Sequence, residues 1–145
     1  MKKGQAAIEF LMTYGWAILA AVIAIGVLAY FGVFSPGQYA ANSAVVTAPF
    51  YANAYNAKAS AGVTLELKNN GGEDYNITSV AISNCGTNAN NVAIAASEAK
   101  TVTVVCNPVL ASGASFKGDI TITYTKTGSA VELTSTGTIV QKVTA

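Results

Sequence analysis

An uncharged segment near the start of the chain constrains its fold more than any other feature. Glu9 is followed by a run from Phe10 to Phe34 that contains no charged residue. As a helix, this run would span ~37 Å at ~1.5 Å per residue, which exceeds the ~30 Å core of a bilayer. A secretory signal peptide has a much shorter apolar core, of only ~7–15 residues. The segment therefore predicts a retained, membrane-spanning helix.

The rest of the chain is organised around this helix. We expect a leader too short to fold at residues 1–4, the helix at 5–35, a neck with one short strand at 36–57, and a β-rich domain at 58–145. Ser35-Pro36-Gly37 is the expected stop signal, because proline disfavours the helical conformation in the residue before it. Within the helix, Thr13 is expected to bond back to a backbone carbonyl.

The C-terminal domain shows the period-two alternation of half-buried strands, most clearly from Val63 to Lys68. Seven or eight short strands are expected, at 45–47, 63–68, 76–83, 92–94, 101–106, 115–125, 130–133 and 137–143. Short strands at regular spacing with turns between them favour an antiparallel β-sandwich. The predicted fold class is therefore α+β: one long hydrophobic helix, then a sandwich. Phe50, Tyr51 and Tyr55 are expected to pack the neck against the helix.

Composition excludes most catalytic chemistry. The chain has no histidine and no arginine, and only 10% of its residues are charged. Without histidine, a Ser-His or Cys-His nucleophile is excluded, and a net charge of +1 does not suggest nucleic-acid binding. The one adjacent acidic pair, Glu73-Asp74, lies in a predicted turn without the spacing of a calcium-binding EF-hand. We therefore expect no enzyme activity, no cofactor and no metal site.

Two cysteines, Cys85 and Cys106, both lie outside the helix. An even pair in an exported domain favours a disulfide, whereas two free buried thiols would be expected if the domain stayed in the cytosol. A disulfide would require the two Cα atoms to lie within ~7 Å of each other.

A second candidate for covalent modification is the triplet Asn76-Ile77-Thr78, which fits the N-glycosylation acceptor pattern. It follows a polar turn, which would expose it. Because the motif is short, unmodified asparagine is the alternative.

The residues before the apolar run resemble a known family. Lys3-Gly4-Gln5-Ala6-Ala7-Ile8-Glu9-Phe10-Leu11 is similar to the leader and first turn of archaeal type IV pilins, which carry a class III signal peptide. The resemblance implies that a prepilin peptidase cuts between Gly4 and Gln5, so that Glu9 becomes the fifth residue of the mature chain. Ala7 departs from the pattern, since serine is frequent there in the methanogen version of the motif.

The resemblance also implies a function. The mature chain would remain inserted in the membrane until assembly. It would then join identical subunits in an extracellular, cell-surface filament that serves adhesion. The helix would form the filament core, and an immunoglobulin-like sandwich would form the outer surface. In that core the Glu9 carboxylate would neutralise the Gln5 α-amino group of a neighbouring subunit. The simpler alternative places Glu9 at the headgroup level near the helix N-terminus, where the dipole stabilises it.

One other class of protein fits the same sequence. A membrane-anchored or secreted β-sandwich that binds a ligand or a surface, and never polymerises, would also need an apolar N-terminal segment. The N-terminal residue of the protein recovered from cells separates the readings. A start at Gln5 indicates a pilin-like subunit, and a start after Ala24 or Gly26 indicates ordinary secretion.

Overall fold

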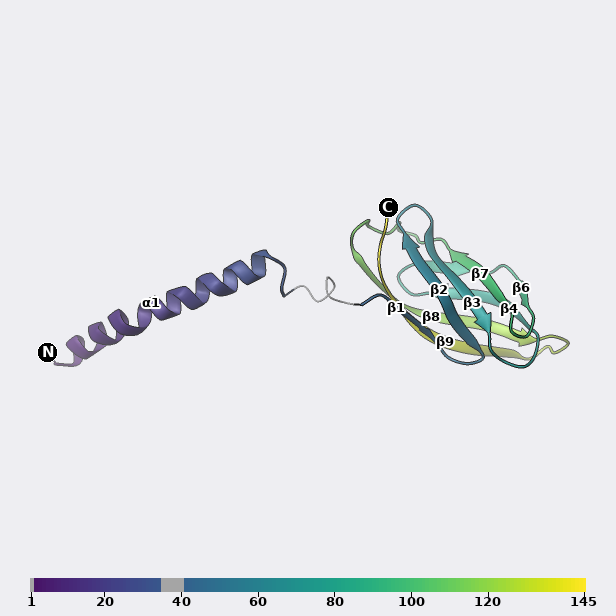
Figure 1. The fold of residues 1–145 in the computed structure, drawn as a ribbon, viewed down its shortest axis with the longest axis horizontal. Helices are drawn as coiled ribbons and strands as arrows, with labels where there is room; N and C mark the ends of the chain where they lie inside the picture. Colours follow the sequence, from purple (N-terminus) through teal and green to yellow (C-terminus); the bar gives the residue numbers. More distant parts are fainter. Residues whose placement is uncertain (1, 35–40) are drawn as a thin grey trace. The chain divides into compact units, whose positions relative to one another are not determined.

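The computed structural model describes residues 2–34 and 41–145, which belong to two separate units. The first is a single helix and the second is built of antiparallel strands (Figure 1). The predicted α+β class, a long apolar helix followed by an antiparallel sandwich, is confirmed.

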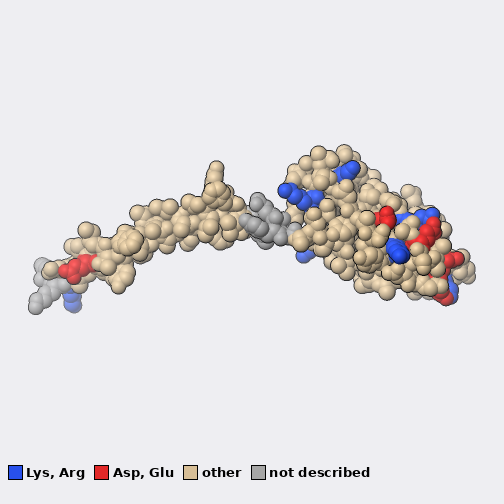
Figure 2. All heavy atoms as spheres, viewed as in Figure 1, with Lys and Arg blue, Asp and Glu red and all other residues tan. Residues whose placement is uncertain are grey.

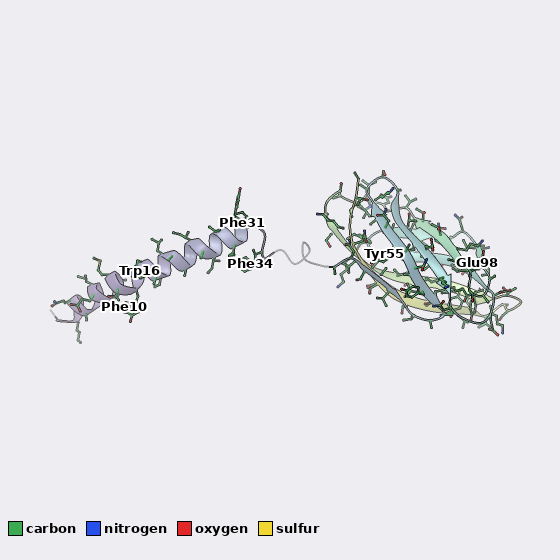
Figure 3. The ribbon with its side chains drawn as sticks, in the orientation of Figure 1. Phe10, Trp16, Phe31, Phe34, Tyr55 and Glu98 are labelled. Atoms are coloured by element: carbon green, nitrogen blue, oxygen red, sulfur yellow. A yellow bond between two sulfur atoms is a disulfide. The ribbon has the colours of Figure 1, made fainter. Side chains whose placement is uncertain are left out.

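The helix, α1, spans Lys2–Tyr30, and none of the residues in its apolar segment is buried. Its large apolar side chains are all exposed; Trp16, for example, is 69% exposed. Figure 2 shows a helix surface almost free of charge beyond its first turns, and the labelled Phe10, Trp16, Phe31 and Phe34 project outward in Figure 3. By length and composition, α1 could cross a membrane. The expected bond within the helix is present, since the Thr13 hydroxyl donates to the Glu9 carbonyl at 2.8 Å.

Both ends of α1 differ from the prediction. Residues 2–4 form its first turn instead of a separate unfolded leader, because extending a formed helix adds one hydrogen bond per residue fixed. At the other end, Gly32 adopts a φ of 73° and donates to Ala29 O, while Val33 donates to Leu28 O. These paired bonds are a Schellman cap, which glycine favours because it tolerates positive φ. The expected stop at Pro36-Gly37 lies outside the described residues.

The second unit is a two-layer sandwich. Its strands are β1 (Ser43–Val46), β2 (Phe50–Lys58), β3 (Gly62–Asn69), β4 (Tyr75–Ile82), β5 (Gly86–Asn88), β6 (Val92–Ile94), β7 (Ala99–Val104), β8 (Ser115–Lys126) and β9 (Glu132–Lys142). One sheet has the order β1-β9-β8-β4-β5, with β6 also pairing with β4, and the other has the order β2-β3-β7. All of these strand pairs are antiparallel.

Alternating side chains from the two sheets fill the core. On β3, Leu65 and Leu67 are fully buried, and on β8 so are Ile120 and Ile122. Three aromatic rings close one end of the core, where Tyr124 lies edge-on to Phe50 at 4.9 Å and to Tyr75 at 5.3 Å. Burying apolar surface at roughly 25 cal/mol per Å² is the main force that holds the two sheets together.

The sandwich begins earlier than the sequence predicts. Residues 43–58, expected to belong mostly to a neck, form β1 and the nine-residue β2. Phe50, expected to pack towards the helix, is 2% exposed inside the sandwich, and Tyr51 and Tyr55 lie on the same strand. A bulge between Ala52 and Ala54 breaks the alternation of β2, which is why period two is hard to see in its sequence. Near the C-terminus, the two expected strands at 130–133 and 137–143 are one strand, β9.

Candidate functional site

The residues predicted to act in processing and assembly lie together at the start of α1. Gly4 and Gln5 occupy the first turns, and Glu9 follows Gln5 by four residues, which places the two side chains on the same face. All three residues are exposed in the single chain. The pairing of Glu9 with the amine of another subunit stays a prediction, because it requires a second copy.

The cysteine prediction is confirmed. Cys85 and Cys106 form a disulfide, with their Cα atoms 4.0 Å apart and both side chains buried. Cys85 follows β4, and Cys106 follows β7, so the bond joins the two sheets. A backbone hydrogen bond from Asn107 N to Cys85 O, at 3.0 Å, holds the same two segments together.

The candidate glycosylation residue lies in a strand. Asn76 belongs to β4, where it pairs with Ala93 on one side and Thr125 on the other. Its neighbour Ile77 is buried in the core, so Asn76 faces the outer surface of the sheet. The side chain is half-buried, and less open than a position just after a polar turn suggests. Modification of Asn76 stays a prediction.

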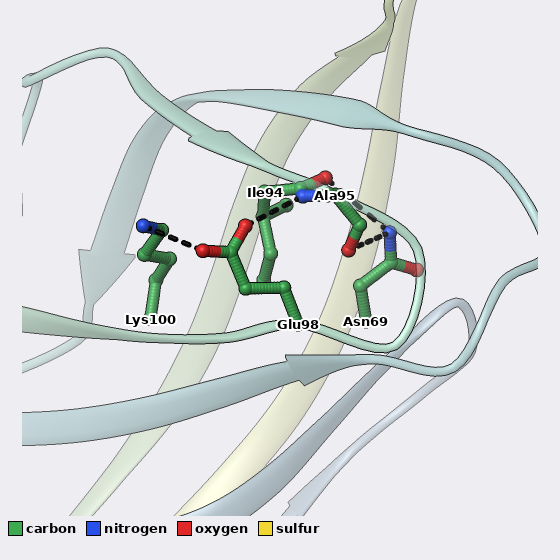
Figure 4. Close-up of polar contacts among 5 residues, drawn as sticks. All are labelled: Asn69, Ile94, Ala95, Glu98 and Lys100. Atoms are coloured by element: carbon green, nitrogen blue, oxygen red, sulfur yellow. Dashed lines mark hydrogen bonds and ion pairs between the residues drawn. The ribbon is translucent and has the colours of Figure 1, made fainter.

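Sequence reasoning missed a polar centre at the end of β3. Asn69 is fully buried, and its Nδ2 lies 2.7 Å from Glu73 O, 3.1 Å from Ala95 O and 3.4 Å from Ile94 O. Its Oδ1 accepts a hydrogen bond from Gly71 N at 2.8 Å. Figure 4 shows this side chain reaching the turn between β6 and β7. The sequence marks Asn69 only as the first residue of a turn, because two of its partners, Ile94 O and Ala95 O, lie on a distant loop.

Acidic side chains also form hydrogen bonds in the turn between β3 and β4 and in the turn between β6 and β7. Glu98 accepts from Ala95 N at 2.9 Å and pairs with Lys100 at 2.7 Å (Figure 4). The hydrogen bond from Lys100, and then the one from Ala95, lower the pKa of Glu98 below its ordinary value. Asp74 accepts from Ala96 N at 2.8 Å. Within the described ranges, no three potential ligands among His, Cys, Asp and Glu come together as a metal site.

The acid beside Asp74 has an ionic partner of its own. Glu73 pairs with Lys126, and this hydrogen bond raises the pKa of the Lys126 ammonium group. The Glu73-Asp74 pair, which the sequence predicts only to lie in a turn, therefore also makes specific contacts. Each of them also holds the turn to a neighbouring segment.

Comparison with known proteins adds no assignment to this geometry. No protein-family model matches the chain, and no curated protein matches it. The structure by itself defines a class: a β-sandwich domain with an internal disulfide, preceded by a helix long and apolar enough to span a membrane.

Proposed function

We propose that this chain is the structural subunit of an archaeal type IV pilus-like surface filament that serves adhesion. The helix forms the core of the filament, and the sandwich forms its outer surface. Before assembly, the subunit is held in the membrane by α1. A prepilin peptidase removes residues 1–4 and leaves Gln5 as the N-terminus.

The observation that carries the proposal is the complete exposure of α1. Every large apolar side chain of the helix is exposed, while the sandwich fills its core with side chains of its own strands and loops. Exposed apolar surface on this scale requires a covering partner. Lipid covers it in the membrane, and identical helices cover it in a filament. The leader-like residues Lys3 to Glu9 favour the second partner, because a plain anchor has no need of them.

Glu9 supplies the chemical test. In a dry bundle of helices its carboxylate needs a positive partner, and the α-amino group of Gln5 on a neighbouring copy is one. Removing one member of a buried ion pair typically costs ~3–5 kcal/mol. Glu9→Ala should therefore give a cleaved, folded, membrane-held subunit that forms few filaments.

The matched control is Thr13→Ala, one turn further along the same face. The Thr13 hydroxyl is already satisfied within its own helix, so its loss should leave filament numbers close to normal. Electron microscopy counts the filaments, and a blot confirms the processed subunit in each strain. Normal filament numbers with Glu9→Ala would leave Glu9 as an interfacial acid only.

Processing is tested separately by mass spectrometry of the native protein. The mature chain should begin at Gln5 and retain α1. A start after Ala24 or Gly26 would remove most of the helix and would contradict the proposal. A retained helix without filaments would favour the non-polymerising, membrane-anchored binding module.

A further inference from the structure

The charges of the sandwich are divided between its two ends. Residues 41–145 contain six lysines and six acids, so the domain has no net side-chain charge. The basic end, as we call it, carries Lys58, Lys117 and Lys142. The acidic end, as we call the opposite one, carries Glu73, Asp74, Glu98 and Glu132, together with Lys68, Lys100 and Lys126. On the face shown in Figure 2, one end of the domain displays lysines alone and the other displays acids mixed with lysines.

Strand pairing places the three lysines of the basic end together. Lys117 on β8 pairs with Val140, two residues before Lys142 on β9. Lys58, the last residue of β2, bridges to Thr144, two residues after Lys142. All three lysines are exposed. The backbone amide of Lys142 donates to the Asn42 side chain at 3.0 Å, so the chain enters the sandwich at this end.

The acidic end is made by the loops at the other extreme of the strands. Glu73 and Asp74 lie between β3 and β4, Glu98 precedes β7, and Glu132 begins β9. Two of these acids have lysine partners at the same end, since Glu73 pairs with Lys126, and Glu98 pairs with Lys100. Neither ion pair includes Asp74 or Glu132.

The two remaining acids lie nearer the middle of the strands. Glu66 is on β3, closer to the acidic end, and Asp119 is on β8, two residues from Lys117. Assigning each to its nearer end gives the basic half three lysines and one acid, and the acidic half five acids and three lysines. The halves thus carry net charges of opposite sign and equal size.

We infer that the basic end of one sandwich docks against the acidic end of a second copy of this chain. The contact joins two different patches, so it is heterologous and propagates into an open helical assembly unless the rotation closes a ring. This inference rests on the proposed function, to which it adds an outer contact between subunits. Such a contact acts mainly by steering copies together and setting their register.

A second copy fits these charges better than a lipid surface does. An anionic membrane would match the basic end, but it would leave the excess acid of the opposite end without a partner. A neighbouring copy satisfies both ends at once. The contact should also be sensitive to salt, because the screening length falls from about 10 Å at 0.1 M to about 3 Å at 1 M ionic strength.

Two variants with equal changes in charge test the inference in full-length protein. The first carries Lys58→Gln, Lys117→Gln and Lys142→Gln at the basic end. The second carries Lys68→Gln, Lys100→Gln and Lys126→Gln at the acidic end. Both lose three positive charges through the same substitution, but at opposite ends. The second variant also removes the ion pairs of Lys100 and Lys126, which are exposed and therefore contribute little to stability. Filaments from cells that make each variant as the sole subunit are counted, and the salt concentration that dissociates them is measured.

The two variants should change assembly in opposite directions. The first should give roughly tenfold fewer filaments, which dissociate at lower salt, because its basic end has lost its charge. The second should give filaments as abundant as wild type or more so, since its acidic end has become more negative. Variants with the same yield and the same salt sensitivity would overturn the inference while leaving the filament function intact.

Two other outcomes are distinguishable from these. If the wild-type chain is processed but forms no filaments, the proposed function itself fails. If the first variant makes normal filaments, but its unassembled form is released from membrane sheets by less salt than wild type, then the lysines contact lipid headgroups, and the inference is again overturned.

Discussion

At the scale of single residues, Asn69 is where we expect a small change to be most costly. We predict that Asn69→Ala lowers the free energy of unfolding of the sandwich by about 1–3 kcal/mol, because it leaves the amide of Gly71 and carbonyls of two loops without partners. Urea unfolding of the chain in detergent, followed by circular dichroism, measures the change. Asn53→Ala is the control, because Asn53 is exposed and bonds only to the Glu66 side chain. Equal effects of the two substitutions would contradict the prediction.

Residue-level prediction from sequence succeeded where the chemistry is specific to one residue type. The disulfide between Cys85 and Cys106 was predictable, because the chain has two cysteines, which can form one intramolecular pair. The role of Asn69 was not, because an asparagine followed by Asn-Gly-Gly indicates a turn whatever its side chain contacts. Its partners Ile94 and Ala95 are more than twenty residues away and reach it only through the packing of the two sheets.

At the scale of the elements, the pairing of β1 with β9 depends on Gly137. A Cβ at this position would fall inside contact distance of the Val45 carbonyl oxygen and Val46 Cα. We predict that Gly137→Ala displaces β1 and costs about 1–3 kcal/mol of stability, as overpacking typically does. Hydrogen exchange should show faster exchange at Ser43–Val46. Gly72→Ala is the control, since a Cβ there meets nothing within 4 Å. Unchanged protection of β1 would show that the strand pair accommodates the added methyl group, and would contradict the prediction.

The bounds of helices and strands were predicted correctly where the hydrophobic pattern is regular. They were predicted wrongly where local backbone geometry determines the bounds. The alternation from Val63 to Lys68 identified β3 within one residue at each end. The bulge in β2 concealed a strand in a segment without β-branched residues, and one positive φ at Gly32 ended α1 before the proline. A bulge and a glycine with positive φ are properties of the folded backbone. The residue types in the sequence allow such conformations but do not show where they occur.

At the scale of the whole molecule, the disulfide joins the two sheets. We predict that reducing it, or replacing it by Cys85→Ser with Cys106→Ser, lowers the stability of the sandwich by about 3 kcal/mol, the value expected for a closed loop of this length. Urea unfolding with and without reductant measures the loss. Reductant should leave the double serine variant unchanged, which controls for effects on the rest of the chain. A wild-type unfolding midpoint that does not change when reductant is added would contradict the prediction.

The position of β1 has a mechanical consequence. The chain enters the sandwich at Ser43, which pairs with Val140 near the end of β9, so the segments that precede β1 and follow β9 leave the domain at the same end. A pull applied through these two segments opens the four residue pairs between β1 and β9 one after another, as in a zipper, instead of loading them together in shear. If the strands give way, the disulfide still keeps residues 86–105 out of the stretched chain. At ~3.5 Å per residue, that shortens the fully extended domain by roughly 70 Å, a length that single-molecule stretching reads directly.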